Sequence, residues 1–576
     1  MERWLLKTLL IVAYLAYDYG NVTARVASLG FSPALFLYLG LYFFLGAAIF
    51  FAAAIPNFYG RLIFVLLFAP ASIYLQSVEW VTGGFVTYET FINHFNSRHS
   101  TGDALMLYGD ALKLLIPTNL LLIVGILLPP GPSRLPFMGW LAPTVPVITL
   151  VLFSAMLYMR GGEGGRALPA SFLPLSYAAL LGFEELTTVK GPRKNVTLPL
   201  TPTKDTRDIV LLVDESVVGN YLDVNNAAGV PTGLKTPTGD WSTVNYGYAA
   251  SVHNCSINTN DVLRFGGTRE SYQDTLRHHP SIWRFAKKAG FRTIYIDAQG
   301  TNGNLLDMTS PTERAALDEL VQFRNVPVIN RDMVVADALA ARINNGRREF
   351  IYVNKMGAHF PIQDKFPDRL AHYQPMLDRG AHKHIVWSSD RTGFNGTPAE
   401  WVRYRNSYRN TLLWTVGEFF QRLFEKADSS KATIIYTSDH GQDLHETGNP
   451  GANTHCGTEY PVQQEGLVPL MIFEARDRPA RDWHKHLASN HNGLSHFRIF
   501  STVLVMMGYE EQAVKPLYGA TLDAPDKDDF SFNTLFNTRL GKKPEWRRID
   551  LSKVNTPPAS DYAPLRANGM AEQQER

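Results

Sequence analysis

Hydrophobic residues are unevenly distributed along the chain: the first third is strongly apolar, and the remainder alternates short apolar segments with polar ones. A helix needs about 20 mostly apolar residues to cross a membrane. The pattern predicts an α-helical five-span transmembrane domain within residues 1–160. The expected spans are residues 4–19, 33–55, 62–77, 112–128 and 137–158.

The first of these segments could also be read as a cleaved signal peptide. Four further spans follow it, and no small-residue cleavage site comes promptly after it, so we expect it to remain in the chain. With the N-terminus inside, the short loops around Arg61 and Arg134 are cytoplasmic, although Arg25 lies on the other side. Five spans then place everything after Arg160 outside the cytoplasm.

The segment from about residue 78 to 111 differs from the other loops, because it is long and polar and has an amphipathic helical pattern. One interpretation is a surface helix at the membrane interface. The other is a floor for a lipid substrate beneath the soluble domain. The two interpretations are compatible, and both stay open.

The polar part of the chain predicts a large α/β domain over residues 207–548. A linker with a tethering helix (161–206) precedes it, and a polar tail that we expect to be disordered (549–576) follows it. Apolar β-branched runs separated by helical patterns are typical of the central strands of a parallel sheet. The expected strands are residues 208–213, 293–296, 350–353, 433–436 and 469–473.

Chemically active side chains follow three of these strands. Glu215 comes after the first, His359 after the third, and Asp439 with His440 after the fourth. Ligands of such sheets gather at the carboxyl ends of the strands, so these side chains are expected at one rim. A lone glutamate there is often solvated, and Asp-His-Gly is often only a turn. Their joint occurrence favours a zinc site built from Glu215, Asp439 and His440.

Two further motifs stand out in the polar domain. His455 follows Asp439-His440 closely and precedes Cys456. Thr259 lies shortly after Cys255 and is expected to open a helix over residues 260–265. A hydroxyl at a helix N-terminus faces N–H groups that can hold a phosphate. The ordinary interpretation is a threonine N-cap.

Composition excludes several classes of protein. Net charge is +2, and there is no basic stripe or finger spacing, so no nucleic-acid partner is expected. The two cysteines are too few for a disulfide-rich scaffold. They could form one bridge in an extracytoplasmic domain.

Together the motifs resemble the membrane-bound phosphoethanolamine transferases of the alkaline phosphatase/sulfatase superfamily, which include the lipid A-modifying enzymes of polymyxin resistance. The resemblance rests on D-I-V-L-L-V-D-E-S, N-C-S-I-N-T-N, M-G-A-H-F-P, Y-T-S-D-H-G-Q and H-C-G-T-E-Y-P, and on the five-span layout. Asp214 and Ser216 depart from the usual Gly and Thr beside the glutamate, and Gln442 replaces an acid. The cysteine usually found after the nucleophile is absent.

The resemblance implies a role for each motif residue. Glu215, Asp439 and His440 match the protein ligands of the tightly held zinc. Thr259, four residues after a cysteine, matches the nucleophile. Two histidines, His359 and His455, are expected to bind a second zinc or the substrate phosphate. Two cysteines, Cys255 and Cys456, are proposed to form a disulfide if both motifs meet at one metal.

The resemblance further implies zinc-dependent transfer of phosphoethanolamine from phosphatidylethanolamine to lipid A or another envelope glycan, through a covalent phospho-threonine. The expected location is a bacterial inner membrane with the catalytic domain in the periplasm. The alternatives are a phosphoglycerol transferase, or a hydrolase of the sulfatase or phosphatase type. No Cys/Ser-x-Pro-x-Arg run supports a sulfatase. An inactive membrane scaffold is the alternative of another class.

Overall fold

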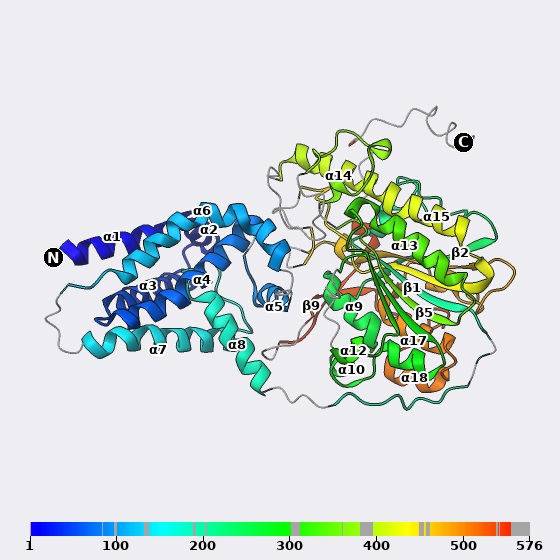
Figure 1. Cartoon of the computed structure of the whole chain (residues 1–576), viewed down its shortest axis with the longest axis horizontal. Coiled ribbons are helices and arrows are strands. Elements are labelled where there is room, and N and C mark those ends of the chain that lie inside the picture. Colours follow the sequence, from blue (N-terminus) through cyan, green and yellow to red (C-terminus); the bar gives the residue numbers. More distant parts are fainter. Residues whose placement is uncertain are drawn as a thin grey trace. The chain divides into compact units, whose positions relative to one another are not determined.

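The computed structural model divides the chain into two compact units, one built mainly from Met1–Val189 and the other from most of the remainder (Figure 1). Described residues are 2–82, 85–96, 101–131, 138–187, 192–201, 203, 205–300, 311–359, 361–380, 396–448, 454–456, 461–536, 540, 542–554 and 561. Each unit has its own apolar core.

The first unit is a bundle of helices. In chain order they are α1 (Glu2–Ala16), α2 (Tyr19–Leu29), α3 (Pro33–Ala54), α4 (Phe58–Thr82), α5 (Tyr88–Asn96), α6 (Thr101–Leu127), α7 (Met138–Met159) and α8 (Leu173–Thr187). Large apolar side chains such as Phe43 and Met159 are 77% and 78% exposed, as expected of helices that face lipid rather than water.

Three helices in the described part of the chain are long and apolar enough to cross a membrane: Pro33–Ala54, Phe58–Trp80 and Met138–Met159. The other two predicted spans are helical as well. Helix α1 has 15 residues, and α6 has 27, of which Ala111–Leu127 is the apolar part whose side chains the structure describes. By length and composition, the described residues therefore contain three candidate spans, and the predicted count of five is not confirmed. The start of the fifth predicted span, Phe137, lies outside the described residues.

The amphipathic segment between α4 and α6 forms the helix α5. Its residue Ile92 is buried, and the ring of Phe91 meets Tyr74 of α4 edge-on. The hydroxyl of Tyr88 donates a 2.7 Å hydrogen bond to Glu184 of α8. The described part of this segment thus contains a short helix that packs on its own unit.

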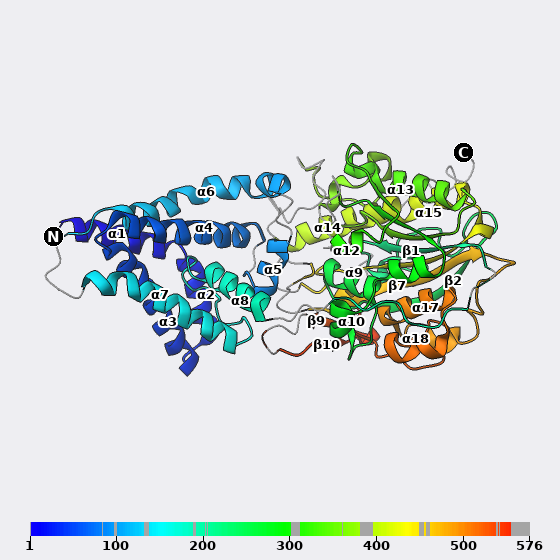
Figure 2. The same cartoon turned by 60° about the horizontal axis from the view of Figure 1, so that its bottom comes forward.

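The second unit is built on an eight-stranded mixed sheet of order β4-β3-β5-β1-β6-β7-β2-β8 (Figures 1 and 2). Strands β3, β4, β5, β1 and β6 are parallel, whereas β7 is antiparallel to both β6 and β2. The bounds are β1 (Asp208–Asp214), β2 (Trp241–Ala250), β3 (Arg292–Asp297), β4 (Glu319–Gln322), β5 (Glu349–Asn354), β6 (Ala432–Ser438), β7 (Leu467–Ala475) and β8 (Leu494–Ser495).

All five predicted strands are present, but the expectation that the last belongs to a parallel sheet is wrong. Strand β7 is fully buried and therefore has the continuous apolar sequence of a parallel central strand. Its direction depends on the connection from β6, which apolar patterning does not specify. A separate hairpin joins β9 (Ser531–Leu535) to β10 (Glu545–Arg548).

Helices cover both faces of the sheet (Figure 1). Val210 and Leu212 of β1 belong to one apolar cluster, and Leu211 and Val213 to the other, following the two-residue period of a strand. The first face is covered by α13 (Val328–Ile343), α14 (Pro398–Leu412) and α15 (Phe419–Lys426). The second is covered by α9 (Ser256–Phe265), α11 (Ile282–Lys288), α17 (Ile499–Met506) and α18 (Glu511–Tyr518).

The pairing of the central strands brings their carboxyl ends to one line. Asp214 at the end of β1 pairs with Ser438 at the end of β6, and Val213 pairs with Asn354 of β5. The residues that follow these three strands therefore leave the sheet side by side, as the sequence predicts.

Part of the predicted disordered tail is described. Residues 551–553 form a short 3-10 helix, and Asp561 is buried between Arg405, Asn406 and Arg409 of α14. Asp561 accepts a charge-assisted hydrogen bond of 3.0 Å from Arg405. Residues 555–560 and 562–576 of the tail lie outside the described part of the chain.

Candidate metal centre

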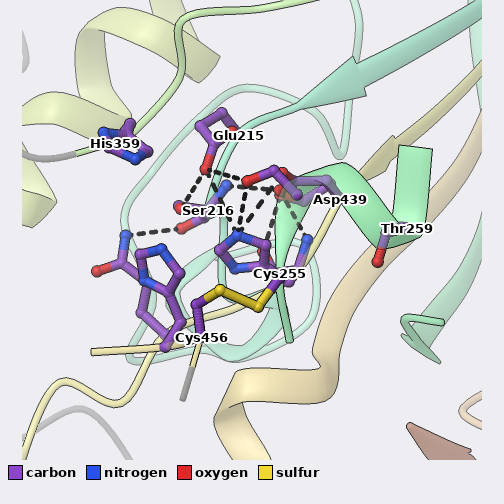
Figure 3. A network of polar contacts seen from close by, with 12 residues as sticks. Glu215, Ser216, Cys255, Thr259, His359, Asp439 and Cys456 are labelled. Atoms are coloured by element: carbon purple, nitrogen blue, oxygen red, sulfur yellow. Dashed lines mark hydrogen bonds and ion pairs between the residues drawn. A yellow bond between two sulfur atoms is a disulfide. The ribbon is translucent and has the colours of Figure 1, made fainter. Parts of the chain in front are cut away.

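Three ligand-type side chains converge where β1 and β6 end (Figure 3). They are Glu215, Asp439 and His440, each fully buried, and one ligand atom from each lies within 4.8 Å of the others. His440 Nε2 is 3.5 Å from Glu215 Oε1 and 3.6 Å from Asp439 Oδ2. The spacing suits a single ion bound between them.

Local hydrogen bonds orient the two carboxylates. The backbone N–H groups of Ser216 and His440 donate to Asp439 Oδ1 at 2.9 and 2.7 Å. Glu215 accepts from the hydroxyl of Ser216 at 2.6 Å and from the amide of Gln299 at 3.0 Å. Ser216 adopts a left-handed backbone (φ 61°), which turns the chain sharply after β1.

A neighbouring glycine allows the loop after β5 to approach this turn. Gly357 has a φ of 51°, and a Cβ there would lie 2.5 Å from Asp214 Oδ1 and 2.5 Å from the carbonyl oxygen of Glu215. No side chain fits at that separation. The glycine before His359 is therefore required for the β5 loop to contact the metal cluster.

The ring of His440 is oriented as in metal-binding histidines. Its Nδ1–H donates a 2.7 Å hydrogen bond to the carbonyl of Gly441, so Nε2 presents its lone pair to the two carboxylates. Burial lowers the pKa of His440 below its ordinary value. The neutral form, which ligates metal, is therefore favoured.

The charge distribution favours a cation at this place. Burial raises the pKa of Glu215, but His359, His440 and the Ser216 hydroxyl outweigh that effect and lower it to about 2. Burial and the adjacent Glu215 raise the pKa of Asp439 well above its ordinary range. Asp439 Oδ2 is buried without a hydrogen-bond partner among the described residues. A divalent ion would satisfy this oxygen and offset both charges, so the residues fit zinc.

Ser256 supplies a second hydroxyl beside the cluster, in addition to that of Ser216, which is fully buried and donates to Glu215. Ser256 is the first residue of α9, and its Oγ lies 3.1 Å from His440 Nε2 and 3.4 Å from Glu215 Oε1. Cys255 occupies the N-cap and makes no side-chain capping bond. The backbone N–H groups at the start of α9 that a capping side chain would normally bind are therefore available to an anion.

The structure does not bring Thr259 to the cluster. Helix α9 begins at Ser256, not at residue 260 as predicted, so Thr259 lies one turn inside it. Its hydroxyl is fully buried, donates to the carbonyl of His253 at 3.1 Å and accepts from the N–H of the same residue at 3.2 Å. Figure 3 shows the side chain pointing away from Glu215 and Asp439. The prediction that Thr259 belongs to the site rested on its position four residues after Cys255.

The two remaining histidines lie beside the cluster. The ring of His455 is 4.4 Å from that of His440 and 6.0 Å from that of His359. His455 Nδ1 lies 2.9 Å from the hydroxyl of Thr454. His359 influences Glu215 electrostatically. The two predicted second-site residues are therefore brought together with the metal candidates.

Cys255 and Cys456 are joined in a disulfide, with their Cα atoms 4.9 Å apart. The N–H of Cys456 also donates a 3.1 Å hydrogen bond to the carbonyl of Asn254. The bridge connects the N-cap of α9 to the residue after His455. It therefore fixes the start of the Ser256 helix to the histidine loop.

Sequence reasoning missed two residues that support the site. Gln299 follows β3 and bonds Glu215 Oε2 and the carbonyl of Lys355. Lys355 directly follows β5, is fully buried, and pairs with Asp214 Oδ2 at 2.6 Å. Both residues follow the end of a strand. Glu215 was selected because it is a polar residue after a strand, and the same criterion would have found Gln299 and Lys355 if it had included amides and lysines.

Comparison with known proteins agrees with this architecture. Residues 248–509 match the sulfatase family model, a range that contains Ser256, Asp439 and His440 and begins after Glu215. The phosphoethanolamine transferase EptA of Escherichia coli K12 is 24% identical over 256 residues, covering 42% of this chain and 43% of the relative. The Kdo(2)-lipid A phosphoethanolamine 7''-transferase of the same strain is 22% identical over 220 residues, covering 37% and 34%.

These alignments span less than half the length of either relative. A solved structure covers more of the chain: the lipooligosaccharide phosphoethanolamine transferase EptA of Neisseria meningitidis has a TM-score of 0.63 at 15% identity, over 90% of this chain and 98% of that one. The fold is thus that of a membrane helical unit joined to a sulfatase-type domain. The resemblance drawn from the motifs is confirmed.

Proposed function

We propose that this chain is a membrane-bound, zinc-dependent transferase that moves phosphoethanolamine from phosphatidylethanolamine to lipid A or another envelope glycan. The observation that carries the proposal is the position of Ser256: a hydroxyl at a helix N-terminus, 3.1 Å from one metal-ligand candidate and 3.4 Å from another. The names of the sequence relatives supply the group that is transferred.

We assign the nucleophile to Ser256 in place of Thr259. The hydroxyl of Thr259 is saturated by the backbone of His253, and freeing it would leave buried groups without partners. Ser256 is partly exposed, and both groups nearest its hydroxyl are members of the metal cluster. The expected intermediate is therefore a phospho-serine and not a phospho-threonine.

Glu215, Asp439 and His440 would hold one zinc ion. When bound, such an ion lowers the pKa of an adjacent hydroxyl and offsets charge on phosphoryl oxygens. His359 and His455 would bind the substrate phosphate or a second ion. Gln299 and the Ser216 hydroxyl hold Glu215 in place from behind.

The chain's own residues then perform a two-step displacement. The Ser256 oxygen bonds to the donor phosphorus, the bond to the diacylglycerol oxygen breaks, and diacylglycerol gains, in net, the proton that Ser256 loses. N–H groups in the first turn of α9 face the phosphoryl oxygens. An acceptor oxygen next attacks the phosphorus, and Ser256 regains a proton as it leaves.

A lipid donor explains why the catalytic unit is joined to a membrane unit. We propose that α1 and α6 cross the membrane together with α3, α4 and α7. The chain would then have five spans, its N-terminus in the cytoplasm and its catalytic domain in the periplasm of a bacterial inner membrane.

The other candidate functions are less well supported. A phosphoglycerol transferase would use the same centre, but the sequence relatives are named for phosphoethanolamine. In an inactive scaffold, burying Asp439 Oδ2 without a hydrogen-bond partner among the described residues would cost free energy. No bound ion would offset that cost. The donor assay below distinguishes these functions.

The test uses the full-length protein in detergent with zinc and a phosphatidylethanolamine that is fluorescent in an acyl chain. We expect fluorescent diacylglycerol from the wild type and from Thr259→Val, but only background from Ser256→Ala. Phosphatidylglycerol with the same label serves as the second donor. Diacylglycerol from phosphatidylglycerol alone would establish phosphoglycerol transfer, and no product from either lipid would contradict a transferase.

A further inference from the structure

A cavity of about 370 Å³ lies inside the first unit, far along the chain from the metal centre. Its walls come from the segment that joins α1 to α2, the last turns of α4, the residue Phe85, and Leu115 of α6. Helices α1 and α4 both pack against α6. The cavity is partly open, because Tyr17 and Trp80 in its lining are exposed. The volume is within the range of small-molecule sites, which begins near about 300 Å³.

The cavity is acidic although the surrounding unit is apolar. Asp18 and Glu79 both line it, and its described lining contains no lysine or arginine. Arg166 acts on Glu79 from outside the lining, with its guanidinium 4.2 Å from the centre of the Phe85 ring. Carboxylates within a membrane domain are costly to bury and usually mark a binding site or pathway. A cation is the ligand that would offset them.

A buried amide in the wall points to a ligand independently of the charges. Gln76 is 4% exposed, and its Oε1 accepts a 3.0 Å hydrogen bond from Asn119. Its Nε2 has no acceptor within hydrogen-bond distance among the described residues, and Asp18 is the cavity carboxylate with which the amide interacts. A buried donor left unsatisfied costs about 1–3 kcal/mol. An acceptor oxygen on the ligand would remove that cost.

Aromatic side chains complete the wall. Tyr17, Trp80 and Phe85 line the cavity, and Trp80 is 45% exposed at the end of α4. Aromatic faces attract ammonium groups, and tryptophan is enriched where a helix meets the lipid headgroups. In the topology proposed above, α1 and α4 both end at the periplasmic side. The cavity therefore lies at the level of the headgroups from which the donor lipid is drawn.

We propose that this cavity binds the headgroup of phosphatidylethanolamine, with the ammonium between Asp18 and Glu79 and an ester or phosphate oxygen accepting from Gln76 Nε2. The proposal rests on the transferase function and gives it a donor-selecting site. A metal ion fits less well, because among the described residues only Glu215, Asp439 and His440 form a group of three ligands. Phosphatidylglycerol lacks the cation that the two carboxylates require.

The experiment measures lipid retention, so that it does not depend on turnover. Full-length Ser256→Ala protein is purified in detergent, mixed with equal phosphatidylethanolamine and phosphatidylglycerol, and analysed by native mass spectrometry. Glu79→Gln and Asp18→Asn are added separately to this background. Glu2→Gln, which neutralises an exposed carboxylate at the start of α1, is the matched control. Thermal unfolding checks that each variant folds.

We expect the background protein and the Glu2→Gln control to prefer phosphatidylethanolamine. In Glu79→Gln or Asp18→Asn that preference should fall by about tenfold, and in the catalytically intact protein the same changes should raise KM for the donor. Equal preference in all four proteins would overturn the cavity site, whatever the enzyme does. If the wild type releases no diacylglycerol but the preference is present and is lost in Glu79→Gln, the transferase proposal fails and the headgroup site stands.

Discussion

The metal centre and the headgroup cavity each bring two carboxylates together, but they are built differently. Glu215 and Asp439 converge with His440 until their ligand atoms lie within 4.8 Å of one another. Asp18 and Glu79 instead face an open volume of about 370 Å³ lined by aromatic rings. The first arrangement fits a compact ion, and the second fits an organic cation with some bulk.

The supporting hydrogen bonds differ in the same way. In the metal centre, backbone and side-chain donors fix both carboxylates and leave one Asp439 oxygen for an ion. In the cavity, the unsatisfied atom is the amide donor Gln76 Nε2, which requires an acceptor on the ligand. The kind of atom left without a partner therefore indicates the chemistry of the ligand more sharply than the charge does.

The largest effect should come from breaking the metal centre. Glu215→Gln or Asp439→Asn removes an anionic ligand, and we expect bound zinc to be lost and diacylglycerol release to fall on the order of 10³-fold, the factor that several kcal/mol corresponds to. Elemental analysis and the donor assay measure the two quantities. Glu425→Gln on the exposed face of α15 should change neither. Full zinc content in Glu215→Gln would remove that residue from the site.

The next largest effect should come from the disulfide that holds the start of α9 to the histidine loop. The bridge closes a loop with a sequence separation of 201 residues, for which the chain-entropy model gives about 5 kcal/mol. Cys456→Ser should therefore lower the unfolding temperature, and reductant should lower that of the wild type but not of the variant. Equal unfolding temperatures with and without reductant in the wild type would show that the bridge contributes no stability.

A smaller effect, on the pH dependence of stability, is expected from a third acid, Glu446. It tests the effect of burial on a carboxyl group that is not a metal-ligand candidate. Glu446 accepts from the Tyr221 hydroxyl at 3.0 Å, and burial, followed by the nearby Asp443, raises its pKa to about 7 from an ordinary 4.5. The folded protein then holds a proton that the unfolded chain releases between these values. Stability should fall as pH rises from about 4.5 to about 7, by at most about 3 kcal/mol.

Replacing Glu446 by Gln should remove this part of the pH dependence and stabilise the protein at neutral pH. Thermal unfolding at several pH values, with Glu425→Gln as the control, measures the difference. An unchanged pH profile in Glu446→Gln would mean that the carboxyl is already ionised in the folded protein.

The sequence was sufficient for features that depend on local patterning. Continuous apolar runs located β1, β3, β5, β6 and β7, and polar residues directly after β1 and β6 located the metal-ligand candidates. The antiparallel direction of β7 was missed because a fully buried strand has the same apolar sequence in either direction. The first predicted span, residues 4–19, extends three residues beyond the helix, because α1 ends at Ala16.

The nucleophile role of Thr259 stays a prediction from a motif. Its distance from Cys255 agrees with that motif, but spacing along the chain does not determine where a side chain points. Whether a hydroxyl points at a metal depends on where the helix starts, and α9 starts three residues before Thr259. The cavity was also beyond the sequence, because Asp18, Gln76 and Glu79 meet only through helix packing.

The most direct test of the account is to find which residue carries the phosphoethanolamine. Full-length protein is quenched shortly after mixing with phosphatidylethanolamine and zinc in the absence of acceptor, digested, and sequenced by tandem mass spectrometry. We predict the modification on Ser256 in the wild type and in Thr259→Val, and none in Ser256→Ala. Modification of Thr259, or an adduct that persists in Ser256→Ala, would contradict the assignment of the nucleophile to the first residue of α9.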